Sequence, residues 1–435
     1  MRNGNTFFDC LPKDWNIAKI GTAFDIKQGK SLSSRKQTGK YLKPFLRTSN
    51  VFWGQLDLSH LDEMDFTDDE CETLTLEYGD LLVCEGGDIG RTAIWRNEKS
   101  ECYYQNHLHR LRVKDEKIDT LFIMYWMQVA LTQLGVYEGF ANKTTIPNLS
   151  GSRLREFIIP VPEKKEQQKI ATVLFKIQKA IEIQESIIEK TRELKKSTLQ
   201  HVFTHGLRGE RMKETEIGWI PDSWKVVRIG ELASVITKGS SPKWQGFDYC
   251  EKGVRFIRSQ NIGNGKLLLD DIVCLPTSFN EKEKRSIIHP GDLLINLVGA
   301  SIGRTAVADE RINDANTNQA VAIVRFKDRS LLNWFVMYYL LTTRGQAEIN
   351  FNKKDIARAN ISLNDISNFF VPKPDKEEQE ETIQILKTID EKIELHTAKK
   401  STLQDLFKTM LNKLMTGEIR VQGLEIDVSE VESCA

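Results

Sequence analysis

FIIPVPEKKEQQ, residues 157–168, returns later in the chain as FFVPKPDKEEQE, residues 369–380. In both places a Pro-x-Pro step ends a run of β-branched and aromatic residues and begins a long stretch rich in Glu, Lys and Gln. Four further pairs keep the same order along the chain: LPKDWNIAKIG (11–21) with IPDSWKVVRIG (220–230), FLRTSNV (45–51) with FIRSQNI (256–262), IGRTA at 89–93 and 302–306, and KKSTLQ at 195–200 and 399–404. One unit of roughly 200 residues therefore occurs twice.

Downstream of each Pro-x-Pro step, apolar residues fall on a stripe of alternating fours and threes, in which polar residues such as Gln184 and Thr191 fill the gaps. This spacing predicts a coiled-coil helix of about 40 residues, or about 60 Å. The stripe consists of Ile170, Leu174, Ile177, Ile181, Ile188 and Leu194 in the first copy, and of Ile383, Leu386, Ile393, Leu403, Leu406 and Met410 in the second. Upstream, short β-branched runs broken by Gly, Asn and Asp predict strands, with one apolar helix at 121–131 and at 331–341.

The first long helix must carry the chain from one globular part to the next, and the second helix offers a matching stripe. Burial of both stripes predicts an antiparallel pair with a globular part at each end of a stiff rod. We therefore predict an α+β fold of two globular α/β domains joined by a long antiparallel two-helix coiled coil, with an internal pseudo-two-fold repeat. The predicted boundaries are 1–162 and 213–374 for the globular domains, 163–212 for the first helix, and 375–435 for the second helix and C-terminal tail. Polar residues on the stripe (Gln184, Thr191, His396) are candidates for fixing the register.

The charges are balanced overall but segregated along the chain. Lys plus Arg and Asp plus Glu each number 61. Residues 26–56 contain seven basic residues and no acidic one, whereas residues 57–80 contain ten acidic residues and no Lys or Arg. We interpret the two stretches as a basic face set against an acidic face, which would steer a polyanion, with plain solvated loops as the alternative.

Several features predict a cytoplasmic protein. No apolar stretch approaches the length of about 18 residues that indicates a transmembrane helix. The first residues, MRNGNTFFDC, lack the apolar core of a signal peptide. The seven cysteines form no CxxC pair, which predicts reduced and mostly buried thiols and no structural metal site.

Two motifs that carry phosphate or nuclease chemistry are incomplete. Gly29-Lys30-Ser31 matches the end of a P-loop, but Phe24 occupies the position of the required first glycine. Pro374-Asp375 followed by Asp390-Glu391-Lys392 fits a loose nuclease pattern, yet these residues fall on the predicted amphipathic helix. We interpret both matches as coincidental.

The histidines give no catalytic set either. His201 and His205 are four residues apart on a predicted helix without the Glu of HExxH, which favours a capping or surface role over a metal pair. His107 and His109 share one face of a predicted strand and are interpreted as partly buried sheet residues. No adjacent prolines occur, so the Asn-Pro-Pro-aromatic signature of adenine methyltransferases is absent from the sequence. The sequence thus predicts no catalytic residue and no metal ligand.

A duplicated unit of globular domain, Pro-x-Pro step, Glu-x-Gln-Gln helix and KKSTLQ, ending in LMTGEIR (414–420), resembles the specificity subunit of type I restriction–modification systems. The resemblance spans residues 11–420. It implies two target recognition domains, each reading one half of a split asymmetric DNA site, and two spacer helices that set the half-site distance and dock two methyltransferase subunits. S-adenosylmethionine, ATP and Mg would be bound only by the methyltransferase and motor-nuclease partners. The first copy ends instead in HGLRGER (205–211), which leaves the C-terminal contact of its helix open.

Reading DNA bases requires Arg, Lys, Asn, Gln and Ser on loops. The candidates in the first copy are Lys30, Ser33, Arg35, Lys36, Lys40, Arg47, Ser49, Asn50, Arg91, Asn142 and Lys143. Those in the second copy are Lys238, Ser240, Lys243, Arg258, Gln260, Asn261, Arg304, Asn352, Lys353 and Lys354. The loop after Gly29 or Gly239 differs most between the copies, as expected if the halves read different bases. An ordinary surface loop is the alternative for each residue, and a structural role explains Arg91 and Arg304 equally well because both copies have them.

Three functions stay open on the sequence alone. The first is a DNA-reading assembly subunit, whose partners would be double-stranded DNA, two methyltransferase subunits and motor-nuclease subunits, without a membrane. The second is a stand-alone enzyme, which the incomplete cofactor and carboxylate motifs disfavour. The third is a scaffold that joins proteins through the coiled coil, and the basic stretch at 26–56 favours the first function over this one.

Overall fold

The structure is a computed structural model that describes residues 5–31, 39–135, 148–327, 330–351 and 360–429. The chain divides into two compact units: unit 1 consists of Met1–Glu185 and Ala398–Ala435, and unit 2 consists of Ser186–Thr397. Within the described ranges, every helix is too short or too polar to pass through a bilayer. The predicted four-part division of the chain stays a prediction.

Unit 1 contains short strands and helices ahead of a long helix. Its strands are β1 (Asn16–Lys19), β2 (Phe24–Gln28), β3 (Leu42–Leu46), β4 (Val51–Phe52), β5 (Gln55–Leu56), β6 (Asp62–Asp65), β7 (Leu81–Cys84), β8 (Thr92–Ile94), β9 (Tyr103–Tyr104), β10 (Leu108–Val113) and β11 (Ile158–Val161). Its helices are α1 (Asn5–Phe8), α2 (Ile20–Ala23), the 3-10 turn η2 (Thr48–Asn50), α3 (Asp68–Leu74), α4 (Thr120–Thr132), α5 (Gly151–Arg155) and the first half of α6 (Lys164–His205).

Unit 2 repeats this order of elements. Its strands are β12 (Met212–Thr215), β13 (Gly218–Pro221), β14 (Lys225–Arg228), β15 (Ala233–Lys238), β16 (Val254–Ile257), β17 (Val273–Leu275), β18 (Leu293–Asn296), β19 (Thr305–Val307), β20 (Asn316–Thr317), β21 (Val321–Phe326) and β22 (Phe370–Lys373). Its helices are α7 (Ile229–Leu232), α8 (Ser278–Lys282), α9 (Asn333–Leu340), α10 (Thr343–Phe351), α11 (Leu363–Asn368) and the first half of α12 (Lys376–Met415), with 3-10 turns η3 (Lys243–Gln245), η4 (Ser259–Asn261), η5 (Lys284–Ser286), η6 (Gly299–Ser301) and η7 (Glu310–Ile312).

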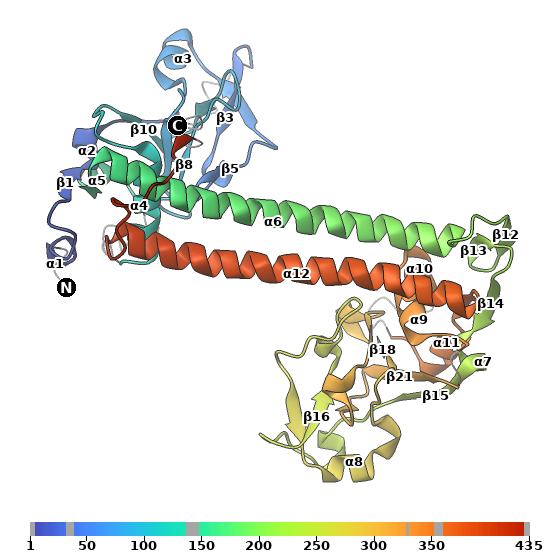
Figure 1. Ribbon diagram of the computed structural model, residues 1–435. Coiled ribbons are helices and arrows are strands. Elements are labelled where there is room, and N and C mark those ends of the chain that lie inside the picture. The colour runs from blue at the N-terminus through green and yellow to red at the C-terminus, as the bar shows by residue number, and fades with distance from the viewer. Residues whose placement is uncertain (1–4, 32–38, 136–147, 328–329, 352–359, 430–435) are drawn as a thin grey trace. The chain divides into compact units, whose positions relative to one another are not determined.

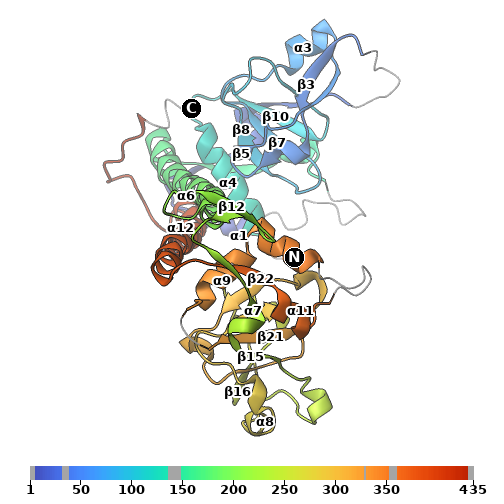
Figure 2. The ribbon, with the colours of Figure 1, turned by 90° about the vertical axis from the view of Figure 1, so that its right-hand side faces the viewer.

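The two units share one sheet topology. A four-stranded sheet has the order β2-β10-β7-β8 in unit 1 and β15-β21-β18-β19 in unit 2. A three-stranded sheet has the order β6-β3-β9 in unit 1 and β17-β16-β20 in unit 2, and the pairs β1-β11 and β14-β22 also correspond. Figure 2 shows β15, β21 and β22 of unit 2 with α7 and α11 beside them. The predicted internal repeat is therefore confirmed.

Each four-stranded sheet is buried on both faces. Leu81 and Val83 of β7 pack into the core that surrounds α4, whereas Leu82 and Cys84 pack into a second core with β3 and β9. This alternation follows from the two-residue period of a strand. Both apolar helices predicted from the sequence are confirmed as α4 and α9.

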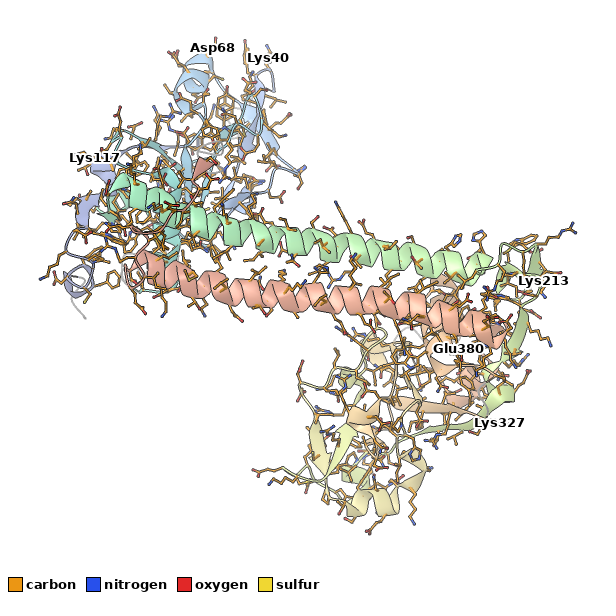
Figure 3. The ribbon with its side chains drawn as sticks, viewed as in Figure 1. Lys40, Asp68, Lys117, Lys213, Lys327 and Glu380 are labelled. Atoms are coloured by element: carbon orange, nitrogen blue, oxygen red, sulfur yellow. The ribbon has the colours of Figure 1, made fainter. Side chains whose placement is uncertain are left out.

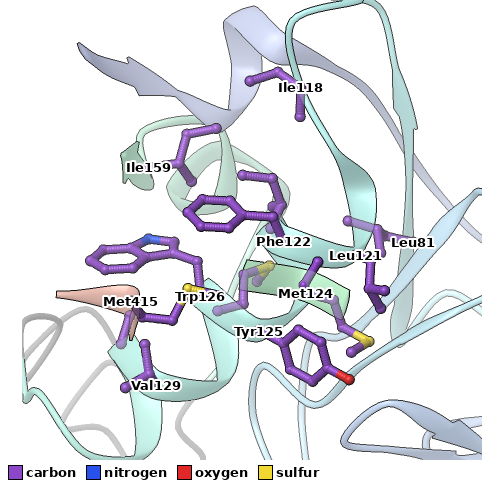
Figure 4. Packing of buried hydrophobic residues seen from close by; sticks show 14 of the residues in the cluster. Leu81, Ile118, Leu121, Phe122, Met124, Tyr125, Trp126, Val129, Ile159 and Met415 are labelled. Atoms are coloured by element: carbon purple, nitrogen blue, oxygen red, sulfur yellow. The ribbon is translucent and has the colours of Figure 1, made fainter. Parts of the chain in front are cut away.

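Helix α4 lies in the centre of the unit 1 core. Its N-cap, Asp119, accepts a hydrogen bond from the backbone N–H of Phe122 at 2.8 Å. Residues from several turns of α4 are fully buried, so the helix is apolar all round, as a core helix should be. Figure 4 shows Phe122, Trp126 and Val129 of α4 packed with Ile159 of β11 and Met415 of α12.

The long helices are antiparallel partners. In unit 1 the beginning of α6 lies beside the end of α12, and in unit 2 the beginning of α12 lies beside the end of α6 (Figure 1). Lys400 bonds to Glu185 at 2.5 Å in unit 1, and Lys195 bonds to Asp390 at 2.5 Å in unit 2. The predicted antiparallel two-helix coiled coil is confirmed. That Gln184, Thr191 and His396 fix its register stays a prediction.

Two of the predicted stripe residues lie off the buried side. Leu194 is 53% exposed and Leu406 is 44% exposed, whereas Ile170, Leu174, Ile188 and Leu386 are buried. A helix turns by about 100° per residue, so the six residues from Ile188 to Leu194 turn by about 600°, which places Leu194 about 120° away from Ile188 around the helix. For these two leucines the assignment to the helix–helix contact is wrong, and an outward-facing contact with a partner stays a prediction.

The helices are nearly equal in length although their motifs are shifted. The second copy has eight fewer residues between its Pro-x-Pro step and KKSTLQ, but seven more between KKSTLQ and the glycine that ends the helix. These two differences nearly cancel, and the helices have 42 and 40 residues. A glycine with positive φ follows each helix: Gly206, at 66°, comes directly after α6, and Gly417, at 70°, comes two residues after the end of α12.

The basic and acidic stretches of unit 1 are paired with each other. Strand β3 of the basic stretch pairs antiparallel with β6 of the acidic stretch, and Lys30 forms an ion pair with Glu70. Lys40 and Asp68, one from each stretch, project from the same part of unit 1 (Figure 3). The predicted separation into a basic and an acidic face is therefore wrong here, because strand pairing brings opposite charges together.

Candidate nucleic-acid interface

One buried glutamine at the start of each long helix ties that helix to its globular part. In unit 1, Gln167 accepts a hydrogen bond from the backbone N–H of Asp119 at 2.9 Å and donates to the carbonyls of Lys117 and Pro162 at 2.9 and 2.8 Å. In unit 2, Gln379 makes three bonds of the same kind, with the N–H of Leu332 and the carbonyls of Ser330 and Pro374. A neutral amide side chain supplies two N–H donors and one carbonyl acceptor, which are the groups that these three bonds use. This requirement explains why both copies have a glutamine at this position.

In unit 1 the neighbouring Glu166 receives the end of the other long helix. Its buried carboxylate accepts from the indole N–H of Trp15 at 3.1 Å and from Arg420 Nε and Nη2 at 2.7 and 3.0 Å. Arg420 also donates to Asp14 at 3.0 and 2.6 Å. Arg420, the last residue of the LMTGEIR motif, thus pairs with the buried charge of Glu166 and fixes the end of the second long helix to unit 1.

In unit 2 the equivalent contact is built differently. Glu378 accepts from the indole N–H of Trp224 at 2.8 Å and from the backbone N–H of Leu207 at 2.6 Å. Arg208 does not bond to Glu378 but to the exposed Glu381 at 3.0 Å. The HGLRGER ending therefore still binds the buried glutamate of the opposite helix. In unit 2 the donor is the backbone N–H of Leu207, whereas in unit 1 it is the side chain of Arg420.

A buried aspartate–arginine pair joins two neighbouring strands in each unit. Arg112 of β10 donates to both carboxylate oxygens of Asp80 at 2.8 and 2.7 Å, and Arg325 of β21 does the same to Asp292 at 2.7 and 2.6 Å. Both carboxylates are almost completely buried. Bidentate pairs of this kind fix geometry as well as charge, so in each unit the pair holds the two central strands of the four-stranded sheet in one arrangement.

Two predicted DNA-contact motifs, RTSN and RSQN, form the same tight turn. Asn50 accepts from the N–H of Arg47 at 2.9 Å, and Asn261 accepts from the N–H of Arg258 at 3.0 Å. Both amide nitrogens donate to backbone carbonyls of the following loop. Arg47 pairs with Asp62 at 2.5 Å, and Arg258 pairs with Asp271 at 3.1 Å. The asparagine amides are thus used within their own turns.

The other predicted contact residues differ in exposure. Lys30 is largely buried, with its ammonium on Glu70 and on the carbonyl of Asp65. Arg91 pairs with Asp88 and lies over the ring of Phe52 at 5.0 Å. Exposed members are Lys40, Ser49, Lys238, Lys243, Gln260 and Arg304, whereas Ser240 is buried. Ser33, Arg35, Lys36, Asn142, Lys143, Asn352, Lys353 and Lys354 lie outside the described residues.

The structure also brings together polar residues that lie outside the predicted DNA-contact set. A cavity of about 500 Å³ in unit 1 is lined by Gln28, Thr48, Glu85, Gly86, Gly87, Asn106, His107 and Asn148. The end of β2, the end of β7 and the beginning of β10 meet at this edge of the sheet, because the three strands are antiparallel neighbours. No local pattern marks these residues, since they come from separate loops.

Buried His109 lies behind this cavity. Its Nε2 is 3.6 Å from the carboxylate of Glu85, and its side chain is 2% exposed. Burial lowers the pKa of His109 below its usual value of 6.5, although the Glu85 carboxylate opposes the shift. The ring is therefore neutral at pH 7. The interpretation of His109 as a buried sheet histidine is confirmed, whereas His107 is exposed.

Unit 1 is expected to lose stability as the pH falls below about 6.5, because burial makes His109 of the folded chain harder to protonate than the same histidine of the unfolded chain. The unfolded chain, whose histidine keeps the usual pKa, binds more protons in this range, so the free energy of unfolding falls with the pH. Urea unfolding of the wild type and of His109→Gln at about pH 7.5 and about pH 5.5 measures the effect. The loss should be smaller in His109→Gln, and an equal loss in both would show another source.

The residues of the incomplete metal and nuclease motifs have structural contacts. His201 and His205 stack near the end of α6, with ring centroids 4.9 Å apart, and both are exposed. Among the residues that the structure describes, no group of three or more His, Cys, Asp and Glu side chains could hold a metal ion. Asp390, part of the loose nuclease pattern, accepts from the hydroxyl of Tyr338 at 2.9 Å and pairs with Lys195. These contacts explain Asp390 as a link between α12, α9 and α6.

Two copies of one family domain account for most of the chain. The family model described as the type I restriction modification DNA specificity domain matches residues 12–192 and again residues 221–405. The chain belongs to this family. Both domain copies begin at equivalent prolines, Pro12 and Pro221, next to the tryptophans that bond to Glu166 and Glu378. Each copy of the specificity domain continues into its long helix, so the glutamine and glutamate anchors belong to the family domain itself.

Relatives of this specificity-domain chain match over most of its length. The type I restriction enzyme MjaVIII specificity subunit of Methanocaldococcus jannaschii is 25% identical over 421 residues, which cover 95% of each chain. The type I restriction enzyme EcoBI specificity subunit of Escherichia coli is 24% identical over 362 residues, covering 79% of this chain and 74% of that one. A crystal structure of the type I restriction-modification S subunit from M. genitalium has the same fold, with a TM-score of 0.58 and 18% identity over 95% of this chain and 97% of the other.

Proposed function

We propose that this chain is the DNA-sequence reader of a type I restriction–modification enzyme. The globular part of each unit reads one half of a bipartite, asymmetric site, and the helix pair sets the spacing of the halves. The main support for this proposal is that the two units share the same internal contacts but differ in their exposed loops. The glutamine anchors, the Asp–Arg pairs and the asparagine turns recur in both units, whereas the exposed loop residues differ. Two domains with the same internal contacts but different exposed loops are suited to reading two unlike DNA sequences.

The helix pair provides the docking surface for two methyltransferase subunits in this proposal. Its outward faces carry exposed apolar side chains, namely Ile183, Leu194, Ile385, Leu395 and Leu406. Ile183 and Leu395 occupy equivalent positions of the two copies, at 55% and 53% exposure, which suits two identical partners. The chain itself performs no catalysis, and the partners supply S-adenosylmethionine, ATP and Mg, with a motor-nuclease subunit joining through the methyltransferases.

A gel shift with random-sequence duplex DNA, with and without the methyltransferase partner, tests the proposal. Sequencing the bound or methylated DNA should give two unlike half-sites separated by an unread gap. Methyl transfer by the purified chain alone would point to an enzyme instead. Absence of DNA binding with any partner would point to a protein scaffold.

Charges placed on the helix pair should prevent assembly. Ile181 and Ile393 are half-buried on the stripe, and a glutamate at either position would lose most of its hydration against the opposite helix. The double variant Ile181→Glu, Ile393→Glu is expected to lose co-elution with the methyltransferase in size-exclusion chromatography. Ser100→Glu, at an exposed position outside the helix pair, is the control and should assemble normally. Normal assembly of the double variant would contradict the stripe assignment.

A further inference from the structure

The cavity of about 500 Å³ in unit 1 contains a carboxylate whose acceptor capacity is only partly used. Glu85 Oε2 accepts a hydrogen bond from Gln28 Nε2 at 2.8 Å, and the same nitrogen donates to the carbonyl of Asn106 at 2.9 Å. Each carboxylate oxygen can accept two hydrogen bonds. Gln28 therefore orients the Glu85 carboxylate while leaving acceptor positions open toward the cavity.

No positive charge neutralises this carboxylate within the described part of the chain. No lysine or arginine described in the structure forms an ion pair with Glu85, and its side chain is 14% exposed. The group behind it, His109, is held neutral because burial lowers its pKa. The Glu85 carboxylate thus offers negative charge and hydrogen-bond acceptors, but no hydrogen-bond donor of its own, to the cavity at the end of β7.

Unit 2 has the same backbone at this edge but different side chains. The backbone N–H of Glu85 donates to the carbonyl of His107 at 2.8 Å, and the backbone N–H of Leu297 donates to the carbonyl of Ala320 at 2.8 Å. The carbonyls of Glu85 and Leu297 then accept from Leu149 and Ile361 at 2.8 and 2.9 Å. The matching positions hold Gln28, Glu85, Asn106, His107 and His109 in unit 1 and Lys238, Leu297, Gln319, Ala320 and Ala322 in unit 2. The fold accepts a buried leucine at the position of Glu85, so it does not require the carboxylate.

We propose that Glu85 reads an exocyclic amine, adenine N6 or cytosine N4, in the major groove of the half-site bound by unit 1. This inference rests on the proposed function and names the base chemistry of one position. Adenine N6 and cytosine N4 are the donors of the major groove, whereas guanine O6 and thymine O4 are acceptors that a carboxylate repels. Phosphates also repel a carboxylate, so Glu85 adds discrimination between bases rather than general affinity.

Glu85→Gln tests the inference in the full chain bound to its methyltransferase. The glutamine keeps an acceptor for Gln28 but adds a donor, so it accepts guanine or thymine as well. We expect discrimination at one base pair of one half-site to fall by roughly tenfold to hundredfold, with the other half-site unchanged. Glu63→Gln, at an exposed position of the same unit, is the matched control and should leave the methylated sequences unchanged.

Duplexes lacking a single amine identify the base. Purine in place of adenine, or pyrimidin-2-one in place of cytosine, is placed at one position at a time, and binding is measured with the wild type and with Glu85→Gln. One analogue should weaken wild-type binding strongly and Glu85→Gln binding little, and its identity shows which base is read.

Two other results are possible, and they differ in meaning. Retained methylation with unchanged discrimination at every position, and no coupling to either analogue, would overturn the reading by Glu85 and leave the proposed function standing. A wild-type complex without any sequence preference would overturn both.

Discussion

Gln167→Ala is expected to lower the free energy of unfolding by about 3–5 kcal/mol, because it leaves one buried N–H and two buried carbonyls without a partner. Gln379→Ala should have an effect of the same size, since its side chain makes the equivalent three bonds in unit 2. Both glutamines are fully buried, so water has little access to the groups they leave. Urea unfolding followed by circular dichroism measures the loss.

The chain offers a neighbouring control in each helix. Gln168→Ala and Glu380→Ala change the adjacent, more exposed residues, and each should alter the free energy of unfolding by less than about 0.5 kcal/mol. Gln167→Glu is a further check, because its carboxylate would face two carbonyl oxygens and should be at least as harmful as alanine. A loss below about 1 kcal/mol in both alanine variants would mean that the glutamines are not the anchors of the helices.

Arg420→Ala should destabilise the chain by about 2–3 kcal/mol, whereas Arg208→Ala should cost less than about 1 kcal/mol. Arg420 donates two hydrogen bonds to the buried carboxylate of Glu166, which would keep only Trp15 and Gln422 as partners. Arg208 pairs with the exposed Glu381, and the buried Glu378 of unit 2 keeps its backbone donor. The two arginines follow the ends of equivalent helices, so the comparison separates a buried charge from a surface pair.

Thermal and urea unfolding of both variants measure the difference. The double variant Arg420→Ala, Glu166→Gln should recover part of the stability, because the unpaired buried charge is removed. Equal costs for Arg420→Ala and Arg208→Ala would contradict the role given to Glu166.

The predicted DNA-contact residues show where a residue-type argument fails. Asn50 and Asn261 were selected because amides read bases, yet each amide is used to close its own turn. Lys30 is one of the predicted loop contacts with DNA, but it is largely buried against Glu70. Glu85 was not selected, because an acidic residue in a DNA-binding protein gives no signal in the sequence. Composition shows which groups a loop carries, but not which of them are already bonded within it.

Repetition and periodicity determined the architecture from the sequence by itself: two similar units, one apolar core helix in each, and an antiparallel pair of long helices. These features are encoded by patterns among residues close together in the sequence, and the internal repeat provides each pattern in two copies. Only the tertiary structure decided which residues of the stripe are buried and left Leu194 exposed, because local periodicity does not specify which side of a helix its partner covers. It alone also brought together Gln28, Glu85 and His109, and joined Glu166 to Arg420, since these residues are distant in the chain and meet only after the strands pair and the helix ends close on each unit.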